Sequence, residues 1–339
     1  MDAGVTANEA DGIRAALVRM GLADPSQDVA LTPLTGGVSS MIVRADVGGR
    51  SLCVKRALAK LKVARDWEAP VERSNAEAAW IREATAIVPD AVPCLLGQDA
   101  SSFAFAMTYL DPAEFPVWKA QLLAGVAEIT TASAVATNLV AIHNATANRP
   151  DLAARFANHD SFFALRLDPY FVAAAEQHAD CKAVLHRIVT RTAETRLALI
   201  HGDVSPKNIL VGAKAPVLLD AECATYGDPA FDLAFCLNHL LLKCVWRPQA
   251  KADYVACYQA FLRNYLPAVA WEPVADIERR ASELLPAMLL ARIDGKSPVE
   301  YITKESDRDT VRGFARQWLL GKPGTPLSAL GEAWEHYLT

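Results

Sequence analysis

The sequence lacks the features that mark several large protein classes. Its seven cysteines include no C-x-x-C pair, and an odd number of scattered cysteines argues against a zinc site and against a disulfide framework. No run of about 18 apolar residues occurs, so no membrane span is expected. The first residues lack the basic start and long apolar core of a signal peptide, and we expect a cytoplasmic protein. A net charge of −5 does not fit a general nucleic-acid binder.

What the sequence does contain is ample apolar material in two different patterns. The chain has 339 residues, of which 52% are hydrophobic, and at about 150 residues per domain two domains are expected. Short β-like runs separated by glycine pairs dominate the first part, whereas Ala- and Leu-rich helical periodicity dominates the second. We therefore predict an α+β fold with a small antiparallel β lobe over residues 1–110 and a larger, mainly helical lobe over residues 111–339.

The patterns place the expected elements along the chain. Strands are predicted at residues 29–34, 40–47, 51–58, 92–99 and 102–110, with Gly48-Gly49 as a two-residue hairpin turn. Helices are predicted at residues 10–21, 74–86, 119–147, 161–195, 229–245, 250–266, 275–293 and 307–320. One hairpin, formed by residues 208–211 and 217–220, interrupts the helical part. Ser74 and Glu77 have capping-box spacing at the start of the second helix.

The stretch HGDVSPKNIL, residues 201–210, leads into that hairpin. Because a tight hairpin brings its ends together, Asn208, Asp220 and Glu222 should converge, with Asp203 just outside them. Their oxygen atoms suit a hard cation such as Mg²⁺, which takes one or two carboxylates plus phosphate oxygens. Asp203 would then be free to orient and deprotonate a hydroxyl group. A polar turn with capping aspartates is the structural alternative.

The order of these residues matches the end of the kinase template, H-x-D-x-x-x-x-N followed by a metal-binding Asp. The same template requires, further upstream, a glycine turn over the phosphates, a strand lysine and a helix glutamate. The residues predicted to bind the nucleotide are Gly36, Gly37, Ser39, Ser40, Lys55, Glu77, Met107 and Tyr109. Glu83 lies on the same predicted helix as Glu77, so the sequence leaves the partner of Lys55 open.

The segments LIHGDVSPKNILV and VLLDAECATYGDPAFDLAF resemble the aminoglycoside phosphotransferase and choline kinase superfamily. The resemblance extends from about residue 30 to residue 320. It implies a two-lobed protein-kinase-like fold, the cosubstrate ATP with Mg²⁺, and phosphorylation of a small-molecule hydroxyl. It also implies that Asp203 is the catalytic base, that Asn208 and Asp220 bind the metal, and that Asp232 braces the catalytic loop.

Within that superfamily the chain shows a partial resemblance to methylthioribose kinase. Asp220-x-Glu222 stands where protein kinases have D-F-G, and this implies a second metal-binding carboxylate. Trp67, in a polar stretch after the third strand, resembles a tryptophan on the substrate side of those enzymes.

The acceptor is expected to be a sugar, an amino alcohol or a related metabolite, and the protein a monomer or a homodimer. Lys207 could contact the transferred phosphoryl group or simply complete the turn. Arg292 and Asp294 flank the predicted end of a late helix, where they could either complete the helix terminus or contact the acceptor. His143 and His239 lie in apolar helical patterns and are interpreted as core histidines.

Two other functions compete with a metabolite kinase. An aminoglycoside phosphotransferase would need an acidic pocket for a polycation, for which the sequence offers Glu272, Asp276, Glu278 and Glu283. A nucleotide-binding pseudokinase with a regulatory role is the alternative from another class, although Lys55, Asp203, Asn208 and Asp220 are all present.

Overall fold

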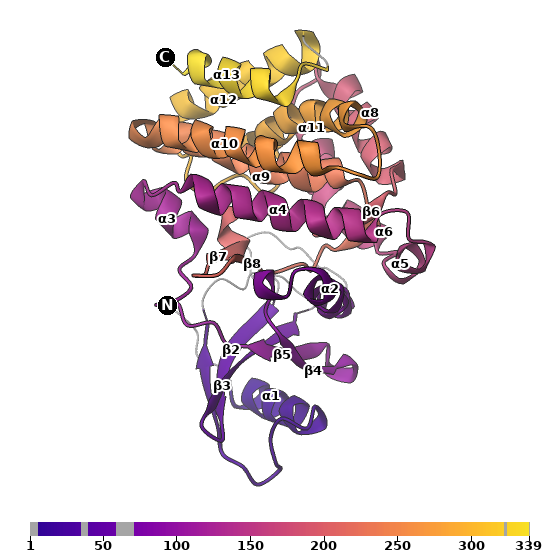
Figure 1. Cartoon of the computed structure of the whole chain (residues 1–339), viewed down its shortest axis with the longest axis vertical. Helices are drawn as coiled ribbons and strands as arrows, with labels where there is room; N and C mark the ends of the chain where they lie inside the picture. Colours follow the sequence, from indigo (N-terminus) through magenta and orange to yellow (C-terminus); the bar gives the residue numbers. More distant parts are fainter. Residues whose placement is uncertain (1–5, 35–39, 59–70, 322–323, 339) are drawn as a thin grey trace. The chain divides into compact units, whose positions relative to one another are not determined.

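The computed structural model describes residues 6–34, 40–58, 71–321 and 324–338. The chain forms two compact units, unit 1 (Met1–Phe115) and unit 2 (Pro116–Thr339). Figure 1 shows the sheet of unit 1 and the helices of unit 2 in the colours of the sequence. The two units are described separately below.

Unit 1 is built on a five-stranded antiparallel sheet with the order β1-β2-β3-β5-β4. Its strands are β1 (Val29–Pro33), β2 (Ser40–Val47), β3 (Arg50–Ala57), β4 (Leu95–Asp99) and β5 (Ala104–Thr108). Gly48 and Gly49 have φ values of +54° and +77°, as the tight turn between β2 and β3 requires. All five predicted strands and this hairpin are confirmed.

Two α-helices, α1 (Ala7–Arg19) and α2 (Arg73–Ile87), complete the described part of unit 1. Helix α1 begins three residues before the predicted start because Thr6 and Glu9 form a capping box there. Its Ile13 and Leu17 join the apolar core on one face of the sheet. Helix α2 carries no side-chain cap at its N-terminus. The predicted capping box of Ser74 and Glu77 is therefore wrong, and Glu77 makes a different interaction.

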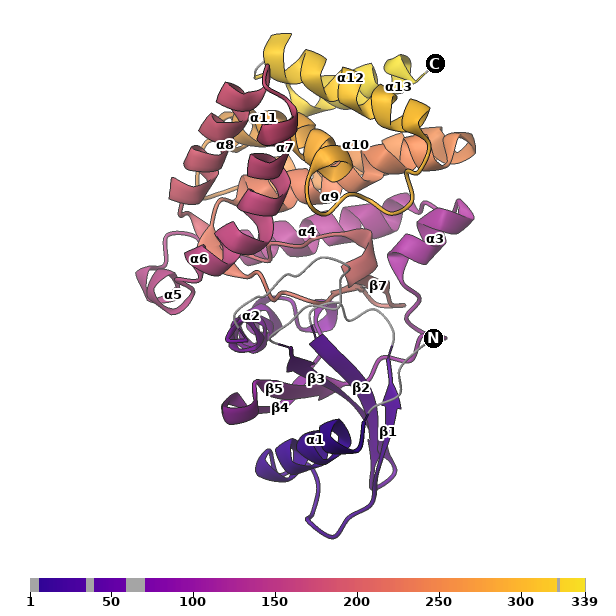
Figure 2. The same cartoon turned by 180° about the vertical axis from the view of Figure 1, so that it is seen from behind.

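Unit 2 is mainly helical. Its helices are α3 (Trp118–Ala124), α4 (Ile129–Thr146), α5 (Pro150–Arg155), α6 (His159–Phe162), α7 (Ala173–Gln177), α8 (Lys182–Glu194), α9 (Pro229–Trp246), α10 (Lys251–Tyr265), α11 (Val274–Asp294), α12 (Glu305–Gly321) and α13 (Leu327–Tyr337). Helix α10 packs against α4 and α9, and α11 packs against α9 and α12, as Figures 1 and 2 show. Helix α9 is buried along almost its whole length, so its polar side chains lie inside the unit.

Two long predicted helices are interrupted in unit 2. The helix predicted at 119–147 is divided into α3 and α4 at Gly125, which has a φ of +83° and so ends α3 in the left-handed conformation. The helix predicted at 161–195 contains the π-helical segment Phe163–Val172, with Pro169 inside it. Proline removes a helical hydrogen bond and crowds the preceding turn, which fits the widened helix here. Helices α5 and α13 were not predicted.

Two small sheets flank the loop at residues 201–208 and the segment that follows the hairpin. The predicted hairpin is confirmed as β7 (Ile209–Val211) and β8 (Pro216–Leu218). A second pair, β6 (Ala198–Ile200) and β9 (Thr225–Gly227), was not predicted. The α+β prediction is confirmed. Among the described residues, no helix combines the length and apolar character that crossing a membrane requires.

Candidate active site

The β7–β8 hairpin brings Asn208 close to Asp220. Ile209 is paired with Leu218, and the backbone N–H of Leu219 donates to the carbonyl of Asn208 at 2.8 Å. Asn208 therefore lies opposite the residue that directly precedes Asp220. The two ends of the hairpin thus lie close together, as predicted.

The ring of His201 ties the loop before the hairpin to the strand that returns from it. Its Nδ1 accepts the backbone N–H of Asp203 at 3.2 Å, and its Nε2–H donates to the carbonyl of Leu219 at 3.1 Å. A backbone donor and a backbone acceptor together fix the neutral tautomer of the ring. Burial lowers the pKa of His201, in agreement with a neutral ring. Through these two hydrogen bonds, the ring of His201 holds the loop of Asp203 next to Leu219, the residue before Asp220.

Asp232 on α9 braces the same loop from the other side. Its carboxylate accepts the backbone N–H groups of His201 at 2.7 Å and Gly202 at 2.8 Å. His143 lies 3.3 Å from the same carboxylate through Nε2 and 2.7 Å from the hydroxyl of Tyr265 through Nδ1. Both ring nitrogens of His143 thus have partners, as expected of a core histidine.

Gly202 is required by the shape of this loop. It has a φ of +77°, a region that favours glycine. A Cβ atom at this position would lie 2.8 Å from the carbonyl oxygen of Cys223. Any side chain here would collide with Cys223.

The carboxylate of Asp203 is buried between two cations. Its Oδ2 lies 2.9 Å from the guanidinium of Arg166 and 3.2 Å from Nζ of Lys207. Burial by itself would raise the pKa of Asp203, but the charges of Lys207 and Arg166 hold the pKa below its ordinary value. The group is therefore an ionised acceptor at neutral pH.

Arg166 is the site residue that sequence reasoning missed. It lies in the π-helical segment, and its Nε donates to the carbonyl of Gly202 at 2.7 Å. The only sequence signal was a single arginine within the apolar run FFALRLDPYFV. Arg166 holds both the backbone and the carboxylate of the HGD loop.

The residues predicted to bind a metal have a donor set that fits Mg²⁺. Asn208 donates through Nδ2 to the carbonyl of Asp203 at 3.1 Å, so its amide oxygen is the atom that could face a cation. Asp220 adopts a φ of +67°, an uncommon backbone conformation for a residue with a side chain. Glu222, two residues later, is buried. Within the described parts of the chain, no three His, Cys, Asp or Glu side chains are grouped to hold an ion by themselves, and a Mg²⁺ ion here would depend on phosphate oxygens.

In unit 1, Lys55 forms a buried ion pair with Glu77. Their Nζ and Oε2 atoms lie 2.7 Å apart, and the side chains are only 4% and 2% exposed. The partner left open by the sequence is therefore Glu77, which connects β3 to α2.

The structure describes some of the other residues of unit 1 that were predicted to bind the nucleotide. Ser40 begins β2 and is buried, and Met107 is buried in β5. The guanidinium of Arg44 lies 5.0 Å from the ring centroid of Tyr109. The remaining ones, Gly36, Gly37 and Ser39, and the predicted substrate residue Trp67 lie outside the described residues.

Arg292 and Asp294 have different surroundings at the end of α11. The carboxylate of Asp294 is bound by Arg312 at 2.7 Å and by His178 at 2.8 Å, and these two bases offset its position at a helix C-terminus. Arg292 is buried, donates to the hydroxyl of Tyr170 at 3.0 Å and to Ser297, and has no carboxylate partner among the described residues. Of these two residues, Arg292 is therefore the one whose charge is not balanced by an oppositely charged side chain of the described residues.

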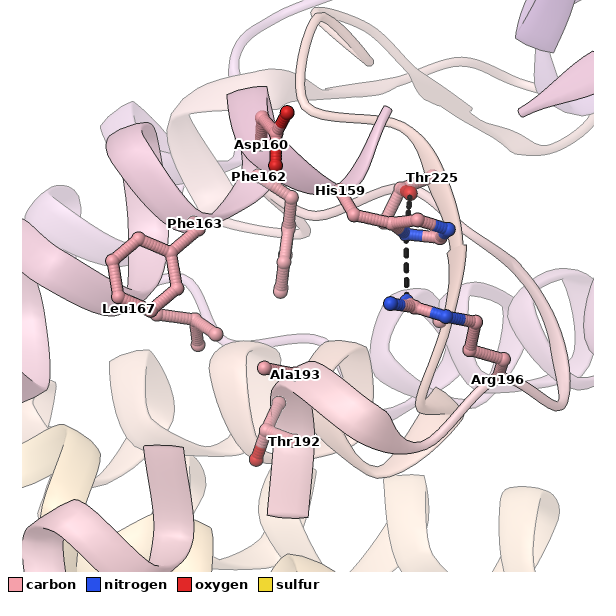
Figure 3. A pocket seen from close by; sticks show the side chains of 10 residues that line it. His159, Asp160, Phe162, Phe163, Leu167, Thr192, Ala193, Arg196 and Thr225 are labelled. Atoms are coloured by element: carbon pink, nitrogen blue, oxygen red, sulfur yellow. Dashed lines mark hydrogen bonds between the residues drawn. The ribbon is translucent and has the colours of Figure 1, made fainter. Parts of the chain in front are cut away.

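A separate pocket of about 170 Å³ lies in unit 2, and none of the predicted site residues lines it. Figure 3 shows the ring of His159 between Thr225 and Arg196, whose side chains lie 3.1 Å and 2.7 Å from its Nδ1. Both contacts are made to Nδ1 of His159, and burial together with the charge of Arg196 lowers the pKa of its ring.

The loop and hairpin of unit 2, and separately the Lys55–Glu77 pair of unit 1, contain the residue types of a kinase-type phosphotransferase. Residues 30–261 match the model of the APH phosphotransferase enzyme family, and the chain belongs to this family. The superfamily resemblance inferred from the sequence is confirmed.

Known relatives agree with this assignment. The chain is 26% identical over 229 residues to methylthioribose kinase 2 of Oryza sativa subsp. japonica, a match that covers 59% of this chain and 53% of the relative. The chain thus spans about half the length of the curated relatives that it matches.

Solved structures show the same fold at low identity. A choline/ethanolamine kinase family protein of Mesorhizobium loti has a TM-score of 0.51 at 16% identity, covering 96% of this chain and 98% of its own. An amicoumacin kinase in complex with AMP-PNP, Ca²⁺ and Ami has a TM-score of 0.52 at 13% identity, covering 95% and 96%. The kinase-like fold is therefore confirmed.

Proposed function

We propose that this protein is an ATP- and Mg²⁺-dependent kinase that phosphorylates a hydroxyl group of a small molecule. The observation that carries the proposal is the buried, ionised Asp203 beside the Asn208–Asp220 hairpin, held in place by Arg166, His201 and Asp232. The names of the relatives support it, since they include kinases of methylthioribose and ethanolamine and a complex with AMP-PNP and Ca²⁺.

In the proposed reaction the acceptor oxygen bonds to the γ-phosphorus of ATP while the bond from that phosphorus to the β–γ bridging oxygen breaks. The hydroxyl proton passes to Asp203, and ADP leaves. A carboxylate with a lowered pKa is a weak base, so Asp203 mainly orients the hydroxyl and takes its proton late, as suits a loose transition state.

Other residues of the chain hold the reacting groups. Asn208 and Asp220, with Glu222 nearby in sequence, would hold Mg²⁺, which neutralises charge on the β- and γ-phosphates. Lys55 would bind the phosphates, and Glu77 keeps its ammonium group in one place. Lys207 would contact the transferred phosphoryl group, because its Nζ already lies 3.2 Å from Asp203.

A screen for acceptor-dependent release of ADP tests this proposal. Sugars, amino alcohols, sugar acids and aminoglycosides are offered with ATP and Mg²⁺, and a hit is checked by ³¹P NMR for a phosphate monoester. Mg²⁺-dependent turnover that is lost in Asp203→Asn supports the proposal. Tight ATP binding without any transfer in the whole screen would favour the pseudokinase alternative.

A further inference from the structure

A basic cavity lies in unit 2, close to the proposed base. Its lining includes Lys207, His239, Lys243, Arg292, Glu300 and Tyr301. Lys207 belongs both to this lining and to the ion pair with Asp203. Lys207 therefore connects the cavity to Asp203.

The charges that line the cavity do not balance. Lys119, also in the lining, forms an ion pair with Glu300, and Lys207 pairs with Asp203. Lys243 and Arg292 are only 1% and 8% exposed, and neither has a carboxylate partner among the described residues. Buried charges without a counter-ion are strongly unfavourable. Arg292 thus leaves an uncompensated positive charge in the cavity. Burial lowers the pKa of Lys243 to about 6, and an anion bound beside Lys243 would favour its protonated form.

Aromatic rings support this charge without neutralising it. Nζ of Lys243 lies 3.4 Å from the ring centroid of Tyr301 and 4.2 Å from that of Trp246. Arg292 lies 5.2 Å from the ring centroid of Tyr170. Cation–π contacts hold a cation in position, but they leave its charge available to an anion.

Two further hydrogen-bonding atoms at the cavity are without partners. Nε2 of His239 and Nε of Arg292 are buried and have none among the described residues, although most buried polar atoms of native proteins are paired. Burial together with the charges of Arg292 and Lys243 lowers the pKa of His239. These atoms could serve as additional donors to a bound group.

The open volume of the cavity is about 30 Å³, which corresponds to about two water molecules. Such a space fits one charged group, not a whole sugar ring. The rest of a ligand would have to extend out of the cavity, and Lys207 marks the side on which Asp203 lies.

We infer that the basic cavity binds a compact anionic group, a carboxylate or a phosphate, of the hydroxyl-bearing acceptor. This inference rests on the proposed kinase function and specifies its substrate class. Lys243 and Arg292 hold the anion, while the hydroxyl of the same molecule lies at Asp203. The transfer step is unchanged: the hydroxyl oxygen bonds to the γ-phosphorus, its proton goes to Asp203, and ADP leaves.

The acidic residues that a polycationic acceptor would need are engaged elsewhere. Glu272 pairs with Arg280 at 2.6 Å, and Glu283 pairs with Arg191 at 2.7 Å. Glu278 accepts the backbone N–H of Leu327 at 3.0 Å. Asp276 lies 3.8 Å from Arg279 on the same helix. None of the four lines the basic cavity, so the charge of the cavity favours an anionic acceptor over an aminoglycoside.

Two sets of related hydroxyl compounds, each with anionic, neutral and cationic members, test the inference. The first set is glycerate, glycerol 3-phosphate, glycerol and 3-amino-1,2-propanediol, and the second is gluconate, glucose 6-phosphate, glucose and glucosamine. Binding to the full chain is measured by calorimetry with AMP-PNP and Mg²⁺, and turnover by ADP release with ATP. We expect at least one anionic member to bind at least 100-fold more tightly than its neutral counterpart. The carboxylate and phosphate members distinguish the two kinds of anion.

Variants identify the residues that bind the anion. Lys243→Met and Arg292→Met should each weaken binding of the preferred anion at least tenfold, with the KM for ATP within twofold of wild type. Lys251→Met is the matched control, because Lys251 on α10 donates to the carbonyl of Glu335 and lies outside the cavity. A circular dichroism spectrum and a melting curve identify any variant that fails to fold, and the uncharged Lys243→Gln then replaces Lys243→Met.

Four results would overturn the inference and leave the kinase proposal intact. The first is equal or better turnover of a neutral or cationic member. The second is unchanged anion binding in both variants. The third is the lack of measurable binding of every anion alongside turnover of another acceptor. A raised KM for ATP in the variants would assign the cavity to the nucleotide and equally overturn the inference. Failure of the kinase proposal itself would instead appear as no transfer to any acceptor of the screen.

Discussion

The guanidinium of Arg166 lies 2.9 Å from Oδ2 of Asp203, and both side chains are almost completely buried. Arg166 also binds the carbonyl of Gly202, so it fixes the position of the loop as well as the charge of the carboxylate. This pair keeps a buried Asp ionised where a buried carboxyl group would otherwise tend to be protonated.

Replacing Arg166 should change the pH dependence of catalysis. The pKa of Asp203 is lowered in the folded protein, so wild-type kcat/KM should show no acid limb from Asp203 above about pH 5. In Arg166→Met the loss of a cation raises the pKa of Asp203, and the acid limb should move up by about one pH unit or more. Arg166→Lys should lie between the two. An unchanged profile in Arg166→Met, with Arg187→Met as the exposed control, would remove Arg166 from this role.

The same pair should contribute to stability in a defined pH range. Because the folded pKa of Asp203 lies below its unfolded value, its stabilising effect is complete above about pH 4 and is lost as pH falls through the folded pKa. Arg166→Met should therefore lower the melting temperature at pH 7 by a larger amount than at pH 3.

Variants of the Lys55–Glu77 pair should distinguish an effect on stability from an effect on ATP binding. Glu77→Leu leaves Lys55 buried without its partner, which should cost about 3–5 kcal/mol of unfolding free energy and raise the KM for ATP. The double variant Lys55→Met/Glu77→Leu removes both charges, so it should recover most of that stability and still bind ATP poorly. Urea denaturation and ATP kinetics measure the two effects. A double variant that binds ATP as well as wild type would exclude Lys55 from phosphate binding.

The melting temperatures of two Asp220 variants should show that the backbone conformation at this position is strained. Glycine accepts a φ of +67° without penalty and alanine does not. The melting temperature of Asp220→Gly should therefore exceed that of Asp220→Ala by roughly 2–4 °C, corresponding to about 1 kcal/mol. Both variants should lose Mg²⁺-dependent turnover, because both lack the carboxylate. Equal melting temperatures would contradict the strained conformation.

Lys243 should make stability rise with pH, as Asp203 does, but over a higher pH range. Burial, with the charge of Lys119 nearby, lowers the pKa of Lys243 to about 6. Between about pH 6 and pH 10 the unfolded chain holds this proton and the folded protein does not, so the contribution of Lys243 to stability rises with pH. The melting temperature gained by Lys243→Met over wild type should thus be largest near pH 6 and shrink towards pH 9. A gain that does not vary with pH, or the same trend in Lys251→Met, would contradict this.

The strands and the loop that contains Asp203 could be predicted from the sequence because local chemistry determines them. Gly48 and Gly49 readily adopt the positive φ values that a tight turn needs, and the β7–β8 hairpin brings Asn208 next to the residue before Asp220. The residue types in these segments leave few alternatives to the observed structure.

Other features depend on contacts between distant parts of the chain. Arg166 reaches Asp203 only because a π-helical segment and a loop 37 residues later meet in unit 2. Lys243 and His239 lie in an apolar helical run, where the sequence gives no sign of an uncompensated charge. Glu77 has the spacing of a cap, and the tertiary ion pair with Lys55 prevailed over that local option.

The kcat of Asp203→Asn, measured with saturating ATP, Mg²⁺ and an acceptor found in the screen, tests the central claim most directly. Asparagine preserves the shape of the side chain and removes its ability to take a proton. The account predicts a fall in kcat of about 10²–10⁴-fold, with the dissociation constant of ATP within about twofold of wild type. A kcat within tenfold of wild type would contradict the assignment of Asp203 as the base, and with it the proposed mechanism.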